Sequence, residues 1–359
     1  MNSYLNDILD RFDLDSAPVE CRDYGCGHIN ATYKVSCASG RHYILQKINS
    51  TAFKDVQGLM QNISAVTEYL KKPGCDPRTV MSIVRTKDGK TYIEHQDGSF
   101  WRVYDFIEDA ICLQSPESER DFYESAVAFG SFQQQLKDFP AETLHESIPN
   151  FHSTPDRYRI FRETLKKDVC GRAGNVGKEI EFVLGREKGA GILIEMLKRG
   201  ELPLRVTHND TKLNNVMLDR KTRKALCVID LDTVMPGLSL YDFGDSIRFG
   251  AATAAEDEQD LSRMELDLKL FRIYTEGFLS ACPGLTARER EMLPEGARIM
   301  TLECGLRFLT DYLDGDHYFS IQRPGQNLDR ARTQFKLVYD MERKMQQMQD
   351  MVKSLSVQA

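Results

Sequence analysis

Apolar and polar positions alternate differently in the two parts of the chain. Apolar residues recur at helical spacing over residues 1–16, and Pro18 then breaks the pattern. Short runs with strand-like alternation follow, separated by turn residues. We expect strands at residues 24–27, 31–37, 42–48, 91–95 and 100–106, with a helix at 51–70. This order favours a small antiparallel sheet with one helix.

From residue 117 onward the helical period dominates. Helices are predicted at residues 121–136, 158–168, 178–186, 190–199, 264–279, 297–313 and 328–355. Strand patterns interrupt them at residues 204–207, 215–219 and 225–230. We therefore expect an α+β fold with two lobes, a sheet-rich N-lobe over residues 1–108 and a mainly helical C-lobe over residues 109–359.

The composition narrows the classes of function. The 359 residues are 41% hydrophobic and 28% charged, which is typical of a globular protein with a substantial core. A formal net charge of −7 argues against a nucleic-acid partner. The nine cysteines form no CxxC pair, and neither a secretory start nor a membrane-length apolar run is visible. We expect a cytoplasmic protein with reduced thiols, monomeric or weakly dimeric, with no membrane partner.

One stretch carries the candidate chemistry. A short strand is expected to end at His208, and the loop after it offers Asp210 and then Asn215. The next strand turns at residues 219–220 and returns to Asp230, so a hairpin brings Asn215 and Asp230 close together. Phosphoryl transfer needs a group that orients the attacking hydroxyl, and oxygen ligands that hold Mg²⁺ against the phosphates. This spacing supplies both, whereas a polar loop with Asx-turns is the alternative.

His208 is the obvious candidate base, but its position favours another role. It stands at a strand end just before Asp210, where an imidazole can hydrogen-bond neighbouring backbone and fix the loop. We interpret His208 as structural.

These motifs resemble a known superfamily. Residues 208–215, His-Asn-Asp-Thr-Lys-Leu-Asn-Asn, and 229–232, Ile-Asp-Leu-Asp, are similar to the catalytic and metal motifs of the aminoglycoside phosphotransferase and choline kinase superfamily, which has a protein-kinase-like fold. Residues 27–33, 101–108, 242–250 and 303–309 resemble bacterial N-acetylhexosamine 1-kinases. The resemblance implies ATP as donor, Asp210 as catalytic base, and Asn215 and Asp230 as Mg²⁺ ligands.

A second motif competes for the metal role. Residues 242–244, Asp-Phe-Gly, spell the metal motif of protein kinases, but they lie further along the chain from Asp210 than Asp230 does. We assign the metal to Asp230 and interpret Asp242 as a buried structural carboxylate that braces the catalytic loop.

Candidate nucleotide ligands lie in the N-lobe. Gly25, Gly27, His28 and Asn30 stand between two expected strands, where backbone N–H groups and polar side chains can approach phosphates. The alternative is an ordinary turn.

The resemblance also implies a cation on the third strand. Gln46 stands where Lys or Arg is expected, and strand alternation puts Lys47 on the opposite face. Either Gln46 donates a neutral hydrogen bond or a bulge turns Lys47 inward. Glu68 on the following helix could pair with such a cation or remain exposed.

Residues 104–107 are expected to enter the connection between the lobes. The backbone of Tyr104, Phe106 and Ile107 could bind the edge of adenine, with Phe106 or Ile107 against the ring. Trp101 is interpreted as a core residue.

The acceptor side is less defined. Asp245, Arg307, Asp311 and Tyr318 are candidate substrate ligands, although Arg307 could instead pair with Asp311 one helical turn away. The resemblance implies GlcNAc or GalNAc, phosphorylated at the anomeric hydroxyl. The alternatives are a kinase of the same fold for an aminoglycoside, choline or another sugar, and a nucleotide-binding pseudokinase.

Overall fold

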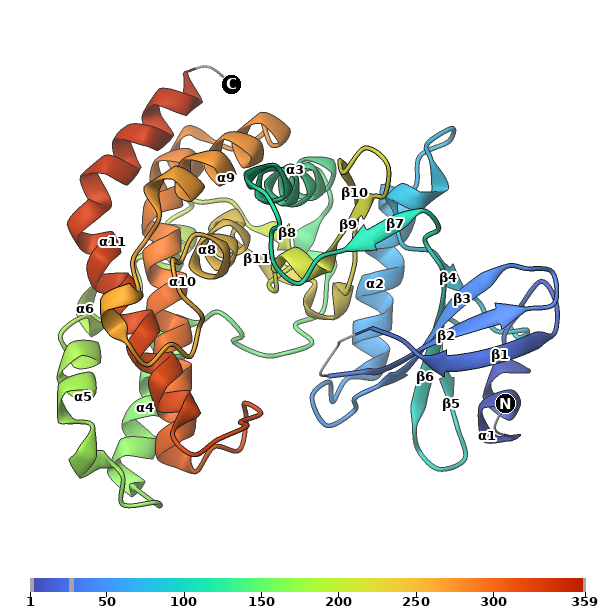
Figure 1. Ribbon diagram of the computed structural model, residues 1–359, viewed down its shortest axis with the longest axis horizontal. Coiled ribbons are helices and arrows are strands. Elements are labelled where there is room, and N and C mark those ends of the chain that lie inside the picture. Colours follow the sequence, from blue (N-terminus) through green and yellow to red (C-terminus); the bar gives the residue numbers. More distant parts are fainter. Residues whose placement is uncertain (1–2, 26–28, 358–359) are drawn as a thin grey trace.

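The computed structural model describes residues 3–25 and 29–357, and its N-terminal part is built on an antiparallel sheet (Figure 1). The strand order is β1-β2-β3-β6-β4, and β5 pairs with β6 outside that path. The strands are β1 (Pro18–Asp23), β2 (Ala31–Cys37), β3 (His42–Ile48), β4 (Ile83–Val84), β5 (Ile93–Glu94) and β6 (Phe100–Asp105).

Strand alternation gives this sheet two different faces. Leu45 and Trp101 pack into a buried cluster with α1 (Ser3–Leu9). Ile44, on the other face, packs against the buried side of α2 (Val56–Leu70). The second face, which α2 covers, is turned toward the rest of the molecule (Figure 1).

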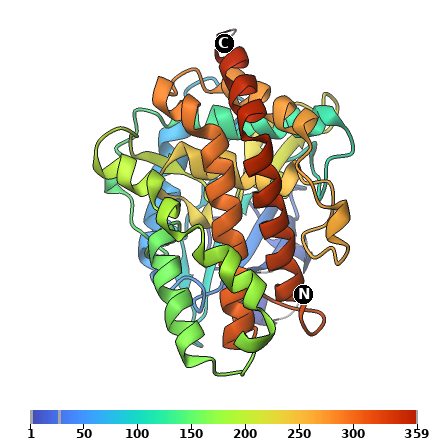
Figure 2. The same ribbon diagram turned by 90° about the vertical axis from the view of Figure 1, so that its left-hand side faces the viewer.

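The C-terminal part is mainly helical. Its centre is a large apolar cluster to which α3, α8, α9, α10 and α11 contribute, and α10 and α11 run side by side (Figure 2). The helices are α3 (Glu119–Gln135), α4 (Thr154–Lys167), α5 (Gly177–Leu184), α6 (Glu187–Ala190), α7 (Ile192–Lys198), α8 (Ser239–Gly250), α9 (Leu268–Ala281), α10 (Ala287–Asp314) and α11 (Gln326–Ser356). Within residues 3–25 and 29–357, no helix combines the length and apolarity needed to cross a membrane.

Two small antiparallel sheets lie between the main sheet and the helices (Figure 1). One has the order β10-β9-β7 and the other pairs β11 with β8. Their strands are β7 (Ala110–Cys112), β8 (Arg205–Thr207), β9 (Val216–Asp219), β10 (Ala225–Val228) and β11 (Met235–Gly237). Short 3₁₀ turns occur at Pro77–Thr79, Ala141–Thr143, Ala173–Asn175, Leu213–Asn215, Leu231–Thr233 and Leu261–Arg263.

The predicted fold class is confirmed, and most differences lie at element ends. Strands β2 and β3 have the predicted bounds, but the first strand lies earlier than predicted and begins at Pro18, which tolerates this place at the start of an edge strand. Helix α2 begins five residues late because Asp55 caps it by accepting a hydrogen bond from the N–H of Gly58. The pattern missed β4, β7 and β11, which are two or three residues long, and the whole of α8.

Helix α8 was missed although Ser239, Asp242 and Ser246 recur at helical spacing, and its residues from Ser239 to Arg248 are all buried. Its Gly244 lies against α10: a Cβ placed there would come within 2.6 Å of the carbonyl oxygen of Gly296 and 2.7 Å of Met300 Cγ. The glycine of the Asp-Phe-Gly motif is therefore required by close helix packing.

We predict that Gly244→Ala lowers the free energy of unfolding by about 1–3 kcal/mol, because the added methyl group overpacks this contact. Chemical denaturation measures the effect. The control is Gly189→Ala in α6, where a Cβ meets no atom within 4 Å. Equal stability of the two variants would contradict the packing argument.

Candidate active site

The loop between β8 and β9 holds Asp210 in a polar setting. Asn215 Nδ2 donates to Asp210 Oδ2 at 3.0 Å and to the carbonyl oxygen of Asp210 at 2.8 Å. Lys212 Nζ forms an ion pair with Asp210 Oδ1 at 2.8 Å. Burial opposes the charge of Lys212, but Asp210 and Asp245 outweigh it, and the pKa of Lys212 is raised. Asp210 is thus a fixed carboxylate with hydrogen-bond partners on both oxygens.

The β9–β10 hairpin brings Asn215 and Asp230 together, as predicted. Val216 pairs with Val228, and the N–H of Ile229 donates to the carbonyl oxygen of Asn215 at 2.9 Å. Asp230 follows immediately in a left-handed conformation, with φ 59°. The end of β10 therefore turns sharply next to Asn215.

His208 is fully buried and fixes both sides of this arrangement. Its Nε2 donates to the carbonyl oxygen of Ile229 at 2.8 Å, and its Nδ1 accepts from the N–H of Asp210 at 3.3 Å. The ring lies edge-on to Phe129 and Phe132. These contacts join the loop between β8 and β9 to the end of β10. We call this loop, which carries the candidate base Asp210, the catalytic loop.

Asp242, in the first turn of α8, is also fully buried. Its carboxylate accepts hydrogen bonds from the backbone N–H groups of His208 and Asn209 at 3.0 and 2.8 Å, and from Gln133 Nε2 at 2.5 Å. Burial raises the pKa of Asp242, and the charge of His208 and these hydrogen bonds oppose that rise. Its oxygens hold the backbone of the catalytic loop in place.

Asp230 differs from Asp242 because solvent reaches it and because it lies among other carboxylates. Desolvation by the surrounding protein, together with the charges of Asp232 and Asp210, raises the pKa of Asp230 to about 6. In residues 3–25 and 29–357, no group of three or more His, Cys, Asp or Glu side chains could hold a metal ion alone. A cation here would take one carboxylate, the Asn215 amide and outside oxygens, which is the ligand set that Mg²⁺ prefers.

On the nucleotide side, part of the predicted loop is described. Gly25 has φ +82° and leaves room for close approach, whereas Gly27 and His28 lie outside the described residues. Asn30 is held at both ends of its amide. Its Nδ2 donates to Asp232 Oδ2 at 2.6 Å, and its Oδ1 accepts from the N–H of Asn49 at 3.0 Å.

The third strand contains no bulge, so the proposed inward turn of Lys47 is wrong. The register with β6 is continuous and pairs Gln46 with Arg102 and Lys47 with Trp101. Lys47 Nζ lies 5.8 Å from the centre of the Trp101 ring, on the face away from Gln46. Glu68 forms an exposed ion pair with Arg85 and does not complete the site.

Sequence reasoning missed Arg102. It is 1% exposed, its Nε and Nη2 donate to Gln46 Oε1 at 3.0 and 2.8 Å, and its Nη2 lies 2.6 Å from Asp232 Oδ1. A guanidinium in a strand of otherwise apolar and aromatic residues was the available signal, because a buried cation needs a partner.

The expected adenine contact is partly corrected. The N–H of Phe106 donates to the carbonyl oxygen of His42 at 3.2 Å, so it is unavailable for a ligand. The side chain of Tyr104 is buried on the face of the sheet that packs against α2, and burial raises its pKa. Ile107 packs beside Ala110 and Met217 in a small apolar cluster between the main sheet and β9.

The acceptor-side candidates divide into two groups. Asp245 accepts from the N–H of Thr211 at 3.1 Å and from Arg248 at 2.8 and 3.0 Å, so it supports the catalytic loop. Asp311 accepts from the N–H groups of residues 317–319 and from Asn327, which fixes the loop after α10.

Arg307 does not form the alternative ion pair with Asp311. Its Nη2 lies 3.3 Å from Tyr318 Oη, and its guanidinium lies 5.1 to 5.5 Å from the ring centres of Phe151, Tyr318 and Phe319. Tyr318 is 66% exposed. This cation surrounded by aromatic rings is a surface that a ligand can reach.

A further buried polar cluster on the acceptor side is centred on Glu303. His152 Nδ1 contacts Glu303 Oε1 at 2.8 Å, and Thr154 donates to Glu303 Oε2 at 2.7 Å. Burial and the charge of Arg307 lower the pKa of Arg157 nearby. Glu303 is thus held by His152 and Thr154, and the Arg157 and Arg307 guanidinium groups lie close enough to repel one another. His152 and Arg157 were not predicted because they lie far from the motifs in sequence.

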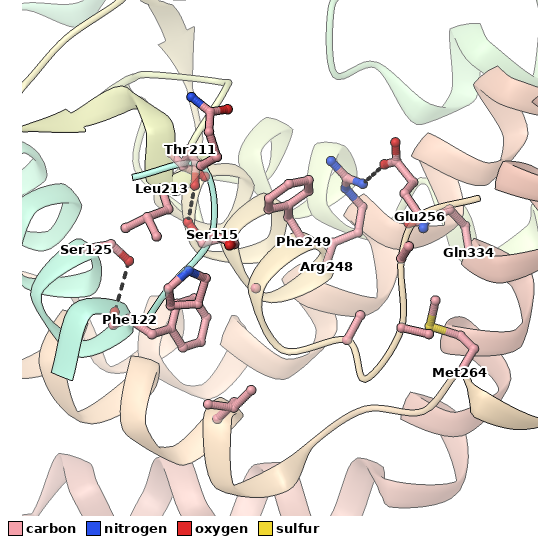
Figure 3. A pocket seen from close by; sticks show the side chains of 18 residues that line it. Ser115, Phe122, Ser125, Thr211, Leu213, Arg248, Phe249, Glu256, Met264 and Gln334 are labelled. Carbon is pink, nitrogen blue, oxygen red and sulfur yellow. Dashed lines mark hydrogen bonds and ion pairs between the residues drawn. The ribbon is translucent and has the colours of Figure 1, made fainter. Parts of the chain in front are cut away.

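A cavity of about 320 Å³ lies between α3, α8 and the loop before α9 (Figure 3). Its wall includes Thr211 and Leu213 from the catalytic loop, and Arg248 reaches Glu256 across it at 2.6 Å. None of the candidate catalytic or metal residues lines this cavity.

The different roles assigned to Asp230 and Asp242 can be tested by measuring stability in the metal-free protein. Folding raises the pKa of Asp230 from about 4 to about 6. The free energy of unfolding therefore falls as pH increases through this range, and the loss is complete above about 6. We predict that Asp230→Ala leaves Tm unchanged or slightly higher at pH 7.5 and abolishes stabilisation by Mg²⁺ with ATP. The pKa of Asp242 is raised as well, but Asp242→Ala leaves the N–H groups of His208 and Asn209 unpaired, so we expect it to lower stability by about 1–3 kcal/mol. The reverse result from thermal denaturation would show that the two roles are exchanged.

Comparison with known proteins agrees with this geometry. The family model described as "Phosphotransferase enzyme family" matches residues 20–274. A microcompartment-associated aminopropanol kinase superposes with a TM-score of 0.58 at 16% identity, covering 97% of this chain and 98% of its own. A spectinomycin phosphotransferase bound to ADP and spectinomycin gives 0.61 at 12%, covering 97% and 99%. An amicoumacin kinase bound to AMP-PNP and Ca²⁺ gives 0.58 at 12%, covering 95% and 93%. The chain belongs to the phosphotransferase enzyme family, with a protein-kinase-like fold.

Proposed function

We propose that this protein is an ATP-dependent sugar kinase that phosphorylates the anomeric hydroxyl of an N-acetylhexosamine, GlcNAc or GalNAc. The observation that carries the proposal is the convergence of Asp210, Asn215 and Asp230 at the ends of β8, β9 and β10. Asp210 orients the hydroxyl and accepts its proton as the oxygen attacks the γ-phosphorus, and ADP leaves.

Asn215 and Asp230 are the residues that would hold Mg²⁺. Burial and the charges of Asp232 and Asp210 raise the pKa of Asp230, and a bound cation would favour its ionised form. Mg²⁺ offsets the charge that develops on the transferred phosphoryl group. The amicoumacin kinase of similar fold was solved with both AMP-PNP and Ca²⁺, which supports use of a divalent ion with the nucleotide.

We place ATP between an N-lobe, residues 1–108, and a C-lobe, residues 109–359. Gly25 and Asn30 would face the phosphates, and the apolar cluster around Ile107 and Met217 would lie against adenine. Backbone groups near Ile107 are the candidates for the edge of the base, because Phe106 has already used its N–H.

The charge of the acceptor side favours a neutral sugar over an amine. Arg157 and Arg307 are close enough for the charge of Arg307 to lower the pKa of Arg157. A cationic aminoglycoside, choline or ethanolamine would add like charge to this group. Arg307 and Tyr318 can instead donate to sugar hydroxyls or to an acetamide oxygen. The resemblance of residues 303–309 to hexosamine kinases points to the same acceptor class.

Removing the proposed base should separate chemistry from binding. We predict that Asp210→Ala lowers kcat by about 10²–10⁴-fold, the range for loss of a general base, while ATP still raises Tm. The control is Asp138→Ala, which removes a carboxylate that is 77% exposed. Substantial residual activity in Asp210→Ala would show that another group accepts the proton.

The acceptor is identified by a direct screen. GlcNAc, GalNAc, galactose, choline and kanamycin are incubated with ATP and Mg²⁺, and ADP release is measured. We expect the two N-acetylhexosamines to stimulate ADP release most and the two cationic acceptors least. Stimulation by choline or kanamycin alone would contradict the proposed acceptor while leaving the kinase assignment intact.

A further inference from the structure

The third strand of this protein offers a neutral glutamine where a nucleotide site needs positive charge, and a buried guanidinium lies directly beside it. Gln46 and Arg102 are register partners on β3 and β6, so both side chains project from the same face of the sheet. This is the face that carries Thr32 on β2 and that adjoins the end of β10.

The contacts fix which end of the Gln46 amide is the donor. Its Oε1 accepts from both Nε and Nη2 of Arg102, which forces Nε2 to the other side. Nε2 donates one hydrogen to Thr32 Oγ1 at 3.1 Å. The amide nitrogen carries a second hydrogen, so Gln46 presents a donor that is oriented and polarised by the cation behind it.

Asp232 anchors the cation and connects it to the catalytic segment. Its Oδ1 lies 2.6 Å from Arg102 Nη2, and its Oδ2 accepts from Asn30 at 2.6 Å. Both oxygens are therefore engaged by residues of the N-terminal sheet region. Asp232 stands two residues after Asp230, so the same ion pair joins the end of β10 to the sheet.

We propose that Arg102, itself paired with Asp232, orients and polarises Gln46, whose amide N–H donates to a phosphate oxygen of the nucleotide. Arg102 is thus a positioning residue and Gln46 the direct phosphate ligand. This inference rests on the proposed function, because it assigns a ligand of the ATP molecule that the kinase uses. Neither Lys47 nor Glu68 takes part, since each lies elsewhere.

Gln46→Glu separates this role from a purely structural one. The carboxylate introduced by this substitution can still accept both Arg102 hydrogen bonds, so the fold is kept, but the amide donor is lost and a second carboxylate, besides that of Asp232, lies against Arg102. We expect Tm without ligand to be equal to or above that of the unaltered protein. KM for ATP should rise about ten- to a hundredfold, the size of one charge-assisted hydrogen bond, while KM for the sugar changes little.

Adenosine and ATP are compared as ligands in thermal-shift titrations of the full chain. Gln46→Glu should lose most of the ATP-induced rise in Tm and keep the rise induced by adenosine, which has no phosphate. The matched control is Arg85→Gln, which changes the net charge equally at an exposed ion pair. It should respond to both ligands as the unaltered protein does.

A second test removes the guanidinium of Arg102 and asks whether a cation placed on the third strand recovers ATP binding. Arg102→Met with Asp232→Asn removes both buried charges together, and we expect it to fold but respond weakly to ATP. Adding Gln46→Lys restores a cation on the third strand and should recover at least part of the ATP response. If Gln46→Glu binds ATP normally, or the added lysine restores nothing, the inference is wrong. If the unaltered protein itself neither binds ATP nor transfers phosphate, the proposed function fails instead.

Discussion

The desolvation of Asp230 beside two other carboxylates is the constraint around which the candidate site is arranged. Burial first, and then the charges of Asp232 and Asp210, raise the pKa of Asp230 at the end of β10. Within the described part of the chain, Asp210 pairs with Lys212 and Asp232 with Arg102, whereas Asp230 forms no ion pair. The carboxylates of Asp210 and Asp232 are thus each paired with a cationic side chain, and we propose that a metal ion pairs with Asp230.

Holding the carboxylates so close requires a rigid support, and buried polar contacts provide it. Asp242 accepts from the backbone of His208 and Asn209, and His208 in turn links the loop to Ile229. The close crossing of α8 and α10 at Gly244 fixes the position of Asp242. Helix packing, a buried carboxylate and a buried imidazole therefore support the loop that carries Asp210.

The sequence predicted what depends on local pattern and short spacing. The β9–β10 hairpin, the proximity of Asn215 and Asp230, and the bounds of β2 and β3 all follow from alternation and turn residues within short stretches. Helix α8 was missed because its polar residues, such as Asp242 and Ser246, are buried inside the fold and so do not mark a solvent-facing side. Arg102, His152 and Arg157 were missed because their roles arise from contacts across the fold, with Asp232, Glu303 and Arg307, which no local pattern reveals.

Transfer of phosphate to one particular hydroxyl is the central claim for the carboxylate site, and the product identifies that hydroxyl directly. The purified protein is incubated with ATP, Mg²⁺ and GlcNAc or GalNAc, and the product is examined by proton-coupled ³¹P NMR. We predict one new phosphomonoester whose phosphorus couples to the anomeric proton of the sugar. A phosphorus coupled to the protons at carbon 6, or no new phosphomonoester with either sugar, would contradict this claim.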